Sequence, residues 1–472
     1  MELNNIEQVH LVGIGGINVS AIAQLLASKG IIVAGSDVAE SSITDMVREK
    51  GITMYLGHSA EHVDKKTDLL VYSEAIPNDN PERLAAAHLE IPQMSAFQFW
   101  GEYAKGKKVI AVSGTNGKST TTAMLGHILV NAGLDPTVVV GTKVLAWHSN
   151  IRIGSSDWLV IEADEYHGHM HEFKPYIAVV TNLALDHLDY YRDADDIKTQ
   201  FEQWLSSVDP EGFIILHRDD AMLSELAIAH KNIRVFGVKG DKGVRSSGDI
   251  ALYEKQGIMG ENSFNIVDDD KDWGYVSLKY PGRHNIQNAL AAAVAADCAG
   301  VRRPKITKAL TSFDGTWRRF EYVGVYNGAF VISDYAHHPD GIRATIDAAR
   351  KWYGEHMDII AVFQPHQHNR TKMLFDDFAA AFDRANRLVL LEIYDVAGRE
   401  EAHDQDVTSK KLAEAVRDHC VAEPATLRED AVEYEPTLTD AEKRAKELAR
   451  KDAVILVMGA GDVDQVARRL VL

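Results

Sequence analysis

The stretch AVSGTNGKSTTTAM, residues 111–124, holds a glycine-rich turn followed by a lysine and several hydroxyl residues. Free N–H groups at the start of a helix bind phosphate, a lysine adds positive charge, and a serine hydroxyl binds Mg²⁺. The usual phosphate-loop pattern, G-x-x-x-x-G-K-[ST], needs a glycine where Val112 stands. A plain glycine turn before a capped helix is the simpler interpretation. Because Gly117-Lys118-Ser119 follows an apolar strand and opens a strong helix pattern, we favour a phosphate site.

Two later apolar stretches end in groups that can hold a metal ion. SDWLVIEADE has Glu162 at its end, and YIAVVTNLALDHLD runs into Asp186, His187 and Asp189. Ligands of open α/β sheets lie beyond the carboxyl ends of the strands, so both ends can face the glycine-rich turn. Glu162 on its own would be a solvated strand end. Beside the Gly-Lys-Ser turn, it predicts a ligand of Mg²⁺.

Alternating strands and helices must position these groups. VHLVGIGGINVSAIAQLLASKG followed by IIVAGSD predicts a strand, a glycine turn, a helix and a second strand. The pattern recurs from VIAVSG and again from AFVISDYAHHP to AVILVMGAGD, which indicates parallel sheets. At 472 residues the chain is too long for one ordinary core. We expect an α/β protein of three domains, at residues 1–103, 104–313 and 314–472.

Composition and charge narrow the class of protein. The chain is 46% hydrophobic and 25% charged, and its formal net charge of −19 argues against nucleic acid or an anionic membrane as partner. The start MELNNIEQVH lacks the features of a secretion signal, and the sequence has no apolar run long enough to span a membrane. Two cysteines, Cys298 and Cys420, are too few for a disulfide scaffold or a cysteine metal site. We expect a cytoplasmic protein.

The N-terminal turn GIGGINVS has its own interpretation. Gly13, Gly15 and Gly16 resemble the dinucleotide-binding fingerprint, with Asn18 in place of the third glycine and Asp37 near the ribose-binding position. Alone, this pattern would indicate an NAD-dependent oxidoreductase. A lone incomplete fingerprint is weak evidence, and that interpretation leaves GTNGKST without a role.

Six motifs together carry a more specific resemblance. They are GTNGKST, EADE, NLALDHLD, GRHNIQNALAA, DYAHHP and FQPHQHNRT. Their order is similar to that in the Mur ligases, a family that builds the peptide of bacterial cell-wall precursors and uses G-T-x-G-K-[ST]. The resemblance spans the whole chain and implies a Rossmann-like UDP-sugar-binding domain, a P-loop-type central ATPase domain and a Rossmann-like C-terminal domain for the amino acid. ATP and Mg²⁺ are the implied cofactors.

The resemblance also implies roles for individual residues. The implied catalytic residues are Lys118, Glu162, His187, His338 and Arg370. ATP contacts would come from Gly114, Thr115, Asn116, Gly117, Lys118, Ser119, Thr120, His284, Asn285, Asn288, Arg319 and Asp334, with Arg318 paired to Arg319 as a phosphate clamp. Ser119, Glu162 and His187 would hold Mg²⁺. The UDP-sugar would contact Gly13, Gly15, Gly16, Asp37, His58 and Ser73. Taken without the resemblance, HNIQN is a polar cluster that opens a helix.

The implied reaction joins an amine to UDP-N-acetylmuramate through an acyl phosphate. The SEAIPNDNPE, QPHQHNRT and YDVAGREE segments favour L-alanine as the amine, with His337, His338 and Arg370 as candidates for holding its carboxylate. Asn116 and Tyr166 depart from the pattern expected for that branch, and Tyr166 is closer to members that attach a recycled tripeptide, L-Ala-γ-D-Glu-meso-diaminopimelate. The amine therefore stays open between the two, as does the choice between monomer and homodimer.

Two further classes of protein compete with this interpretation. His167, His169 and His171 in HGHMH alternate along the chain, as the ligands of a zinc hydrolase or a metal-binding module can. A solvated loop on the substrate side is the simpler explanation. A UDP-sugar-binding protein without catalysis is the other alternative, and intact Lys118 and Glu162 argue against it.

Overall fold

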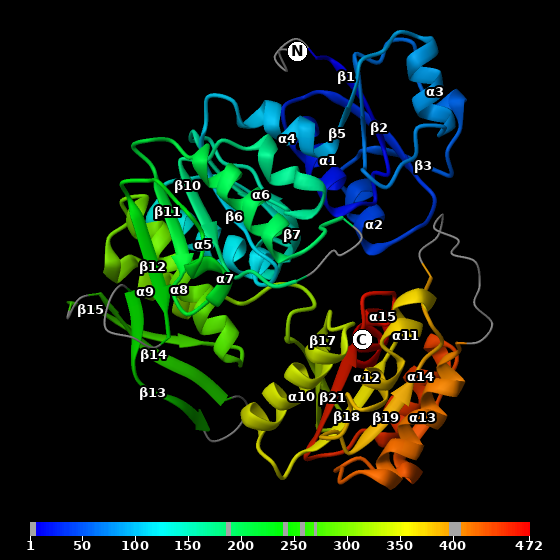
Figure 1. The fold of residues 1–472 in the computed structure, drawn as a ribbon. Coiled ribbons are helices and arrows are strands. Elements are labelled where there is room, and N and C mark those ends of the chain that lie inside the picture. Colours follow the sequence, from blue (N-terminus) through cyan, green and yellow to red (C-terminus); the bar gives the residue numbers. More distant parts are fainter. Residues whose placement is uncertain (1–5, 186–189, 239–243, 255–259, 269–270, 396–406) are drawn as a thin grey trace. The chain divides into compact units, whose positions relative to one another are not determined.

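A computed structural model of the chain describes residues 6–185, 190–238, 244–254, 260–268, 271–395 and 407–472. Three sheets organise these residues, with helices between their strands (Figure 1). Two compact units are distinguished: Met1–Ile250 with Ser263–Leu278 and Arg283–Gly315, and Ala251–Asn262 with Lys279–Gly282 and Thr316–Leu472. The first holds the N-terminal sheet and most of the central sheet, and the second holds the C-terminal sheet. The predicted three-part α/β fold is confirmed. Its predicted limits near residues 104 and 314 fall between successive sheets.

The N-terminal sheet has five parallel strands in the order β3-β2-β1-β4-β5. They are β1 (Gln8–Val12), β2 (Ile32–Asp37), β3 (Thr53–Leu56), β4 (Leu69–Tyr72) and β5 (Gln93–Ser95). The helical elements are α1 (Ile17–Ser28), α2 (Ser42–Glu49), η2 (Ala60–His62), α3 (Pro81–His88) and α4 (Ala96–Ala104). The predicted strand–turn–helix–strand opening is therefore correct. Because all strands run parallel, the glycine turn after β1 and the residues after β2 and β3 share one edge.

The central sheet has ten strands in the order β15-β14-β13-β12-β11-β10-β6-β9-β7-β8. They are β6 (Lys108–Ser113), β7 (Thr137–Val144), β8 (Ser149–Arg152), β9 (Trp158–Glu162), β10 (Ile177–Val180), β11 (Phe213–His217), β12 (Ile233–Gly237), β13 (Val244–Glu254), β14 (Gly260–Asp268) and β15 (Lys271–Leu278). Its helical elements are α5 (Lys118–Ala132), η3 (Leu145–Trp147), η4 (Tyr166–Glu172), α6 (Ala194–Ser206), α7 (Ala221–Ser224), α8 (Arg283–Cys298) and α9 (Arg303–Ser312). β6 lies between β9 and β10, so the ends of these three strands are neighbours.

Helix α5 fixes the position of the lysine motif against the central sheet. Its N-cap Gly117 and its C-cap Gly133 both have left-handed backbone angles, with φ of 86° and 88°. Met124, Leu125 and Ile128 are fully buried, and the helix packs against α8. This apolar packing holds the start of α5 at the carboxyl end of β6.

The C-terminal sheet has six strands in the order β16-β17-β21-β18-β19-β20, with only β16 antiparallel to its neighbour. They are β16 (Glu321–Tyr326), β17 (Ala329–Asp334), β18 (Asp358–Phe363), β19 (Arg387–Leu390), β20 (Val432–Tyr434) and β21 (Ala453–Met458). The helical elements are α10 (Pro339–Tyr353), α11 (His368–Met373), α12 (Phe375–Ala379), α13 (Ser409–Ala422), η5 (Glu429–Ala431), α14 (Leu438–Leu448) and α15 (Asp464–Val471). The segments after β17 and β18 therefore lie at one edge of this sheet. They carry the candidate histidines and Arg370, which was predicted in a loop and lies in helix α11.

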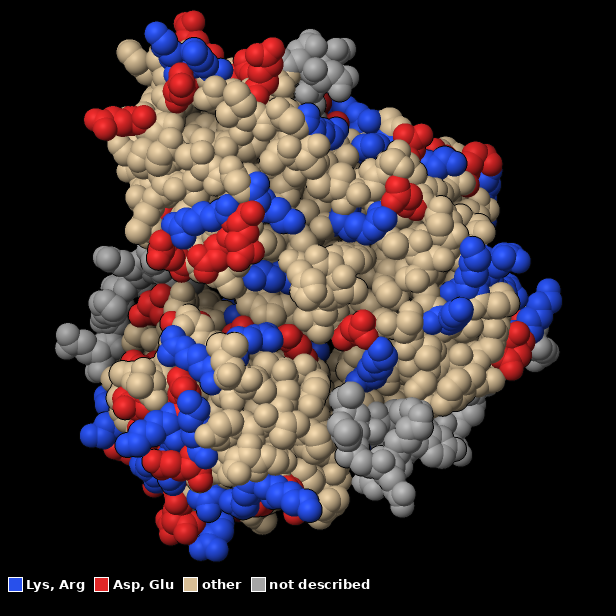
Figure 2. Space-filling view, turned by 180° about the vertical axis from the view of Figure 1, so that it is seen from behind, with Lys and Arg blue, Asp and Glu red and all other residues tan. Residues whose placement is uncertain are grey.

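The surface carries charges of both signs. On the face shown in Figure 2, Lys and Arg side chains are interspersed with Asp and Glu side chains. The described part of this face therefore presents no broad basic surface to a polyanion. Among the helices of the described residues, none is both long enough and apolar enough to cross a bilayer.

Candidate active site

The turn after β6 has the geometry of a phosphate loop. Gly114 and Gly117 have φ of 122° and 86°, and a Cβ on either would collide with a neighbouring side chain, Thr181 or Asn288. The first intrahelical hydrogen bond of α5 runs from Thr121 N–H to Gly117 O, so the N–H groups before it need partners from outside the helix. These N–H groups belong to Lys118, Ser119 and Thr120. They lie at the positive end of the helix dipole, where anions bind.

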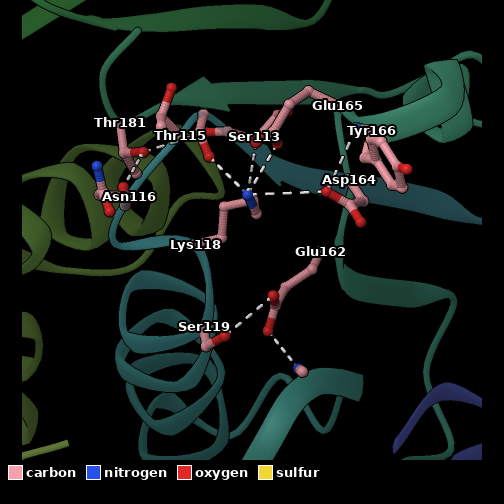
Figure 3. Close-up of polar contacts among 12 residues, drawn as sticks. Ser113, Thr115, Asn116, Lys118, Ser119, Glu162, Asp164, Glu165, Tyr166 and Thr181 are labelled. Carbon is pink, nitrogen blue, oxygen red and sulfur yellow. Dashed lines mark hydrogen bonds and ion pairs between the residues drawn. The ribbon is translucent and has the colours of Figure 1, made fainter. Parts of the chain in front are cut away.

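Lys118 points across this turn to the acids that follow β9 (Figure 3). Its Nζ donates hydrogen bonds to Gly114 O at 2.8 Å and to Glu165 Oε2 at 2.8 Å, and lies 3.8 Å from Asp164 Oδ1. Burial alone would lower the Lys118 pKa, but the Glu165 and Asp164 carboxylates outweigh it and raise the pKa. The lysine is therefore held as a cation beside the loop.

Ser119 and Glu162 face each other just below the lysine (Figure 3). Ser119 Oγ donates to Glu162 Oε2 at 3.1 Å, and the Gly141 N–H donates to the other oxygen. Burial raises the Glu162 pKa, and these two hydrogen bonds with the charge of Lys118 offset the effect only in part. The Ser119 hydroxyl and the Glu162 carboxylate, whose negative charge is only partly balanced, are hard oxygen ligands. Mg²⁺ is commonly held by one or two carboxylates together with the phosphates of a substrate. The residues present therefore fit Mg²⁺. The third predicted ligand, His187, lies outside the described residues together with Asp186 and Asp189.

The outer part of the loop is supported from β10. Asn182 accepts the Thr115 N–H through its backbone oxygen and the Asn116 N–H, at 3.0 Å, through its side chain. Asn116 O in turn accepts hydrogen bonds from Thr181 Oγ1 at 2.6 Å and from Asn182 Nδ2 at 2.7 Å. Thr115 and Asn116 therefore shape the loop, while the free N–H groups lie at the start of α5.

Helix α8 brings part of its predicted nucleotide cluster to the loop. Asn288 is buried, and its Oδ1 occupies the space in which a Gly117 side chain would lie. Asn285 is buried one turn earlier, and His284 is exposed near the start of the helix. The structure thus places Asn288 against the phosphate loop and His284 at the surface.

The N-terminal glycine turn closes against β2. Gly15 N–H donates to Asp37 Oδ2 at 2.8 Å, and a Cβ on Gly15 would meet the same oxygen. Gly13 has φ of 79°, and Gly16 is the N-cap of α1. A Cβ on Gly13 would collide with Ser73, so Ser73 also lies against the turn. Six residues are predicted to bind the UDP-sugar. Three of them, Gly13, Gly15 and Gly16, belong to this turn, and Asp37 and Ser73 lie against it. The sixth, His58, follows β3 at the same edge of the sheet.

The two predicted arginines after α9 have different environments. Arg318 is 5% exposed, has a positive φ, and donates to Gly459 O. Arg319 is exposed, and its guanidinium lies 5.0 Å from the centre of the Tyr335 ring. Only Arg319 is thus accessible to a ligand. Asp334 accepts hydrogen bonds from the N–H groups of Phe320 at 2.6 Å and Ala336 at 2.8 Å, so it shapes this loop.

A basic cluster lies at the carboxyl edge of the C-terminal sheet. Arg370 Nη1 is 3.4 Å from His366 Nδ1, and the His366 and His337 ring centres are 6.2 Å apart. Burial lowers the His337 pKa to about 4, with further lowering by Arg370, His366 and Arg319. His338 instead caps helix α10, where its ring accepts the Asp340 N–H. The structure thus brings His337, rather than His338, to Arg370.

The HGHMH segment does not gather its histidines. His169 stacks on Phe97 at 3.8 Å between ring centres, and His171 hydrogen-bonds Gln200 at 2.9 Å. His167 has a positive φ and lies against Tyr190, with 4.8 Å between ring centres. In the described ranges no three histidine, cysteine or acidic residues converge as a metal site. The zinc-site interpretation therefore has no support in these residues.

Sequence reasoning missed three residues of these sites. Glu165, the partner of Lys118, is the last of the three acids of EADE, and Asn182 lies two residues after the end of β10. His366 stands four residues before Arg370 in QPHQHNR. Polar residues two or three positions after the end of a buried strand were the available signal for all three.

Comparisons with known proteins cover the same three regions. Residues 8–108 match the family description "Mur ligase family, catalytic domain", residues 112–296 match "Mur ligase middle domain", and residues 318–461 match "Mur ligase, glutamate ligase domain". These matches follow the three sheets in order.

Individual relatives extend along nearly the whole chain. A UDP-N-acetylmuramate–L-alanine ligase of Clostridium perfringens is 38% identical over 98% of this chain and 96% of its own. One of Clostridium acetobutylicum is 39% identical with the same coverage. The crystal structure of a UDP-N-acetylmuramate–alanine ligase from Thermotoga maritima superposes with a TM-score of 0.82 at 29% identity, covering 98% of each chain. Three domain matches in order, full-length identity and a shared fold lead to one conclusion: this chain belongs to the Mur ligase family.

Proposed function

We propose that this chain is an ATP-dependent ligase that joins L-alanine to UDP-N-acetylmuramate in the synthesis of peptidoglycan precursors. The observation that carries the proposal is the 38% identity, over 98% of the chain, to a ligase with that activity in its name. The phosphate loop after β6 supplies the ATP site that such a reaction needs. Because the reaction consumes ATP, we assign it to the cytoplasm.

The reaction has two covalent steps. A carboxylate oxygen of the muramate attacks the γ-phosphorus of ATP, which forms an acyl phosphate and releases ADP. The amino group of L-alanine then attacks the acyl carbon, the phosphate leaves and the amine loses a proton. The products are an amide, ADP and phosphate.

The first step brings two anions together, so positive charge at the γ-phosphate lowers its barrier. We assign this role to Lys118 and to the N–H groups of Lys118, Ser119 and Thr120 at the start of α5. Lys118 is already held in place by Glu165 and Gly114 O. The phosphates would take over from Glu165 as its partner.

Ser119 and Glu162 would hold Mg²⁺, with His187 as a further proposed ligand. When bound, the ion would neutralise charge on the phosphate oxygens. The N–H of Gly141 keeps the Glu162 carboxylate oriented toward Ser119. This contact makes Gly141 a positioning residue for the metal ligand.

The second step needs the alanine carboxylate fixed while its amino group stays free. We assign the carboxylate to Arg370, whose planar fork suits bidentate contact with a carboxylate. His337 and His366 lie beside it, and Arg319 contributes to the same positive potential. A tripeptide presents its first carboxyl group as an amide, so this cluster favours a free amino acid.

An isotope experiment tests the acyl-phosphate step. UDP-N-acetylmuramate carrying ¹⁸O in its carboxylate is incubated with ATP, L-alanine and the enzyme, and the released phosphate is analysed by mass spectrometry. One ¹⁸O atom per phosphate is expected, because the carboxylate oxygen stays on phosphorus when the amide forms. Unlabelled phosphate accompanied by amide product would contradict the mechanism.

A further inference from the structure

A buried carboxylate lies beneath the predicted UDP-sugar edge of the N-terminal sheet. Glu82, in the first turn of α3, is fully buried and receives four hydrogen bonds. Oε1 accepts from Ser59 N–H at 3.1 Å and from His62 Nδ1 at 2.8 Å. Oε2 accepts from His10 Nε2 at 3.1 Å and from Ser36 Oγ at 2.5 Å. A carboxylate has about four acceptor sites, so the hydrogen-bonding capacity of Glu82 is filled.

The full set of donors keeps Glu82 ionised. Burial would raise its pKa, but the hydrogen bonds from the surrounding histidines and Ser36 outweigh burial and lower it. An ionised carboxylate only accepts hydrogen bonds. The single hydroxyl proton of Ser36 is therefore committed to Glu82.

This commitment determines the proton position on His58. His58 Nδ1 lies 2.9 Å from Ser36 Oγ. Because the hydroxyl proton of Ser36 points to Glu82, Ser36 Oγ can only accept a hydrogen bond from His58. The Nδ1 atom of His58 must therefore carry a proton. In a neutral ring Nε2 is then unprotonated and accepts a hydrogen bond.

His58 is placed where a ligand can reach it. It follows β3 directly after Gly57, whose N–H donates to Asp37 O at 2.8 Å. Asp37 also accepts the N–H of Gly15 in the glycine turn. The ring is half-buried, with 13% of its side chain exposed. As a residue that follows β3, His58 lies at the carboxyl edge of the sheet, where ligands of such sheets bind.

We infer that Glu82 and Ser36 are positioning residues that fix His58 in its Nδ1-protonated form, so that Nε2 accepts a hydrogen bond from an N–H or O–H group of the UDP-sugar. The inference rests on the proposed UDP-sugar function of this domain. In this neutral form Nε2 cannot bind the phosphates, since they carry no donor at neutral pH. The donors of the UDP-sugar are on its uracil, ribose and amino-sugar parts.

Glu82→Gln reverses this chain of hydrogen bonds. The amide NH₂ can donate to Ser36 Oγ, which leaves the Ser36 proton for His58 Nδ1 and moves the ring proton to Nε2. Ser36→Ala removes the link itself and leaves the Glu82 carboxylate in place with one donor fewer. His10→Gln is the matched control, because it alters another donor to Glu82 and leaves Ser36 and His58 in place.

The first measurement is the His58 tautomer in the ligand-free, full-length enzyme, by ¹⁵N NMR of histidine-labelled protein with His58→Gln for assignment. We expect Nδ1 protonated and Nε2 unprotonated in the wild type, and Nε2 protonated in Glu82→Gln. Because the wild-type spectrum needs no variant, poor folding of Glu82→Gln leaves the test intact. A wild-type ring protonated on Nε2, either alone or together with Nδ1, would overturn the inference.

The second measurement is calorimetric binding of UDP-N-acetylmuramate. Glu82→Gln and Ser36→Ala should each weaken binding about tenfold, the loss expected for one hydrogen bond. Their kcat should stay near the wild-type value, and His10→Gln should bind normally. Wild-type affinity in both Glu82→Gln and Ser36→Ala would refute the positioning role. If wild-type enzyme does not bind the UDP-sugar, the proposed function fails while the tautomer result stands.

Discussion

The ammonium group of Lys118 lies between the two carboxylate oxygens of Glu165, 2.9 Å from Oε1 and 2.8 Å from Oε2. The pair is mostly enclosed, with 18% and 5% of the two side chains exposed. A protein carboxylate therefore holds the lysine before any phosphate arrives. In the proposed mechanism ATP exchanges one anionic partner of Lys118 for another, so the ammonium group would need little reorganisation.

Replacing Lys118 with Ala should lower kcat for phosphate release by about 1000-fold, because the cation that stabilises the transferring phosphoryl is lost. Binding of UDP-N-acetylmuramate should persist, because its proposed site belongs to a different sheet. Steady-state kinetics and calorimetry measure the two effects separately. Wild-type turnover would show that the lysine is not at the phosphates.

The same substitution needs a stability control. Lys118→Ala leaves the Glu165 carboxylate buried without its main partner, which should destabilise the ATP-free protein by about 3 kcal/mol. The double variant Lys118→Ala/Glu165→Gln removes that charge and should recover most of the loss. If the double variant regains stability but not turnover, the kinetic defect is catalytic rather than structural.

Glu162→Gln should raise the Mg²⁺ concentration needed for half-maximal rate and lower kcat on the order of 100-fold. An amide oxygen is a weaker ligand for a hard cation than a carboxylate. Titration of MgCl₂ at saturating substrates checks this, with Asp157→Asn, at the other end of β9, as the control. An unchanged titration would remove Glu162 from the metal site.

Arg370→Ala should raise the KM for L-alanine by about 10- to 100-fold, the loss expected for charge-assisted hydrogen bonds to a carboxylate. The KM for UDP-N-acetylmuramate should change little. Arg343, which pairs with Asp340 on the first turn of α10, is a suitable control for loss of a surface charge. Equal effects of Arg343→Ala and Arg370→Ala would argue for a general electrostatic change instead.

His337 should make the folded protein less stable in mild acid. Its pKa falls from the ordinary 6.5 to about 4 on folding, so the unfolded chain binds the proton more readily. Its contribution to stability is therefore complete above pH 6.5 and is lost as pH falls toward 4. The loss is about 3 kcal/mol. Urea unfolding of wild type and His337→Gln between pH 4 and 7 tests this, and parallel curves would contradict it.

Much of this arrangement could be predicted because it is local. Short apolar runs followed by glycine and then a helical pattern identified β1, β6 and their loops, and Glu162 was found because it ends a buried strand. The order of six motifs identified the family. Strands β13–β15 at the edge of the central sheet were not predicted.

Choices between adjacent residues could not be made from sequence. His337 and His338 have the same chemistry, and the start of helix α10 decides that His338 caps it while His337 turns to Arg370. Arg318 has a positive φ and is buried, whereas the neighbouring Arg319 is exposed. The partnership of Lys118 with Glu165 joins residues 47 positions apart and depends on β6 and β9 being neighbours.

The most direct test is the choice of amine. Purified enzyme is given ATP, Mg²⁺ and UDP-N-acetylmuramate with L-alanine, L-serine, glycine or the tripeptide L-Ala-γ-D-Glu-meso-diaminopimelate at equal concentration, and the amide products are quantified by mass spectrometry. We predict rapid formation of UDP-N-acetylmuramoyl-L-alanine, slower reaction with serine and glycine, and the least product with the tripeptide. Preferential ligation of the tripeptide would contradict the account and identify a recycling ligase.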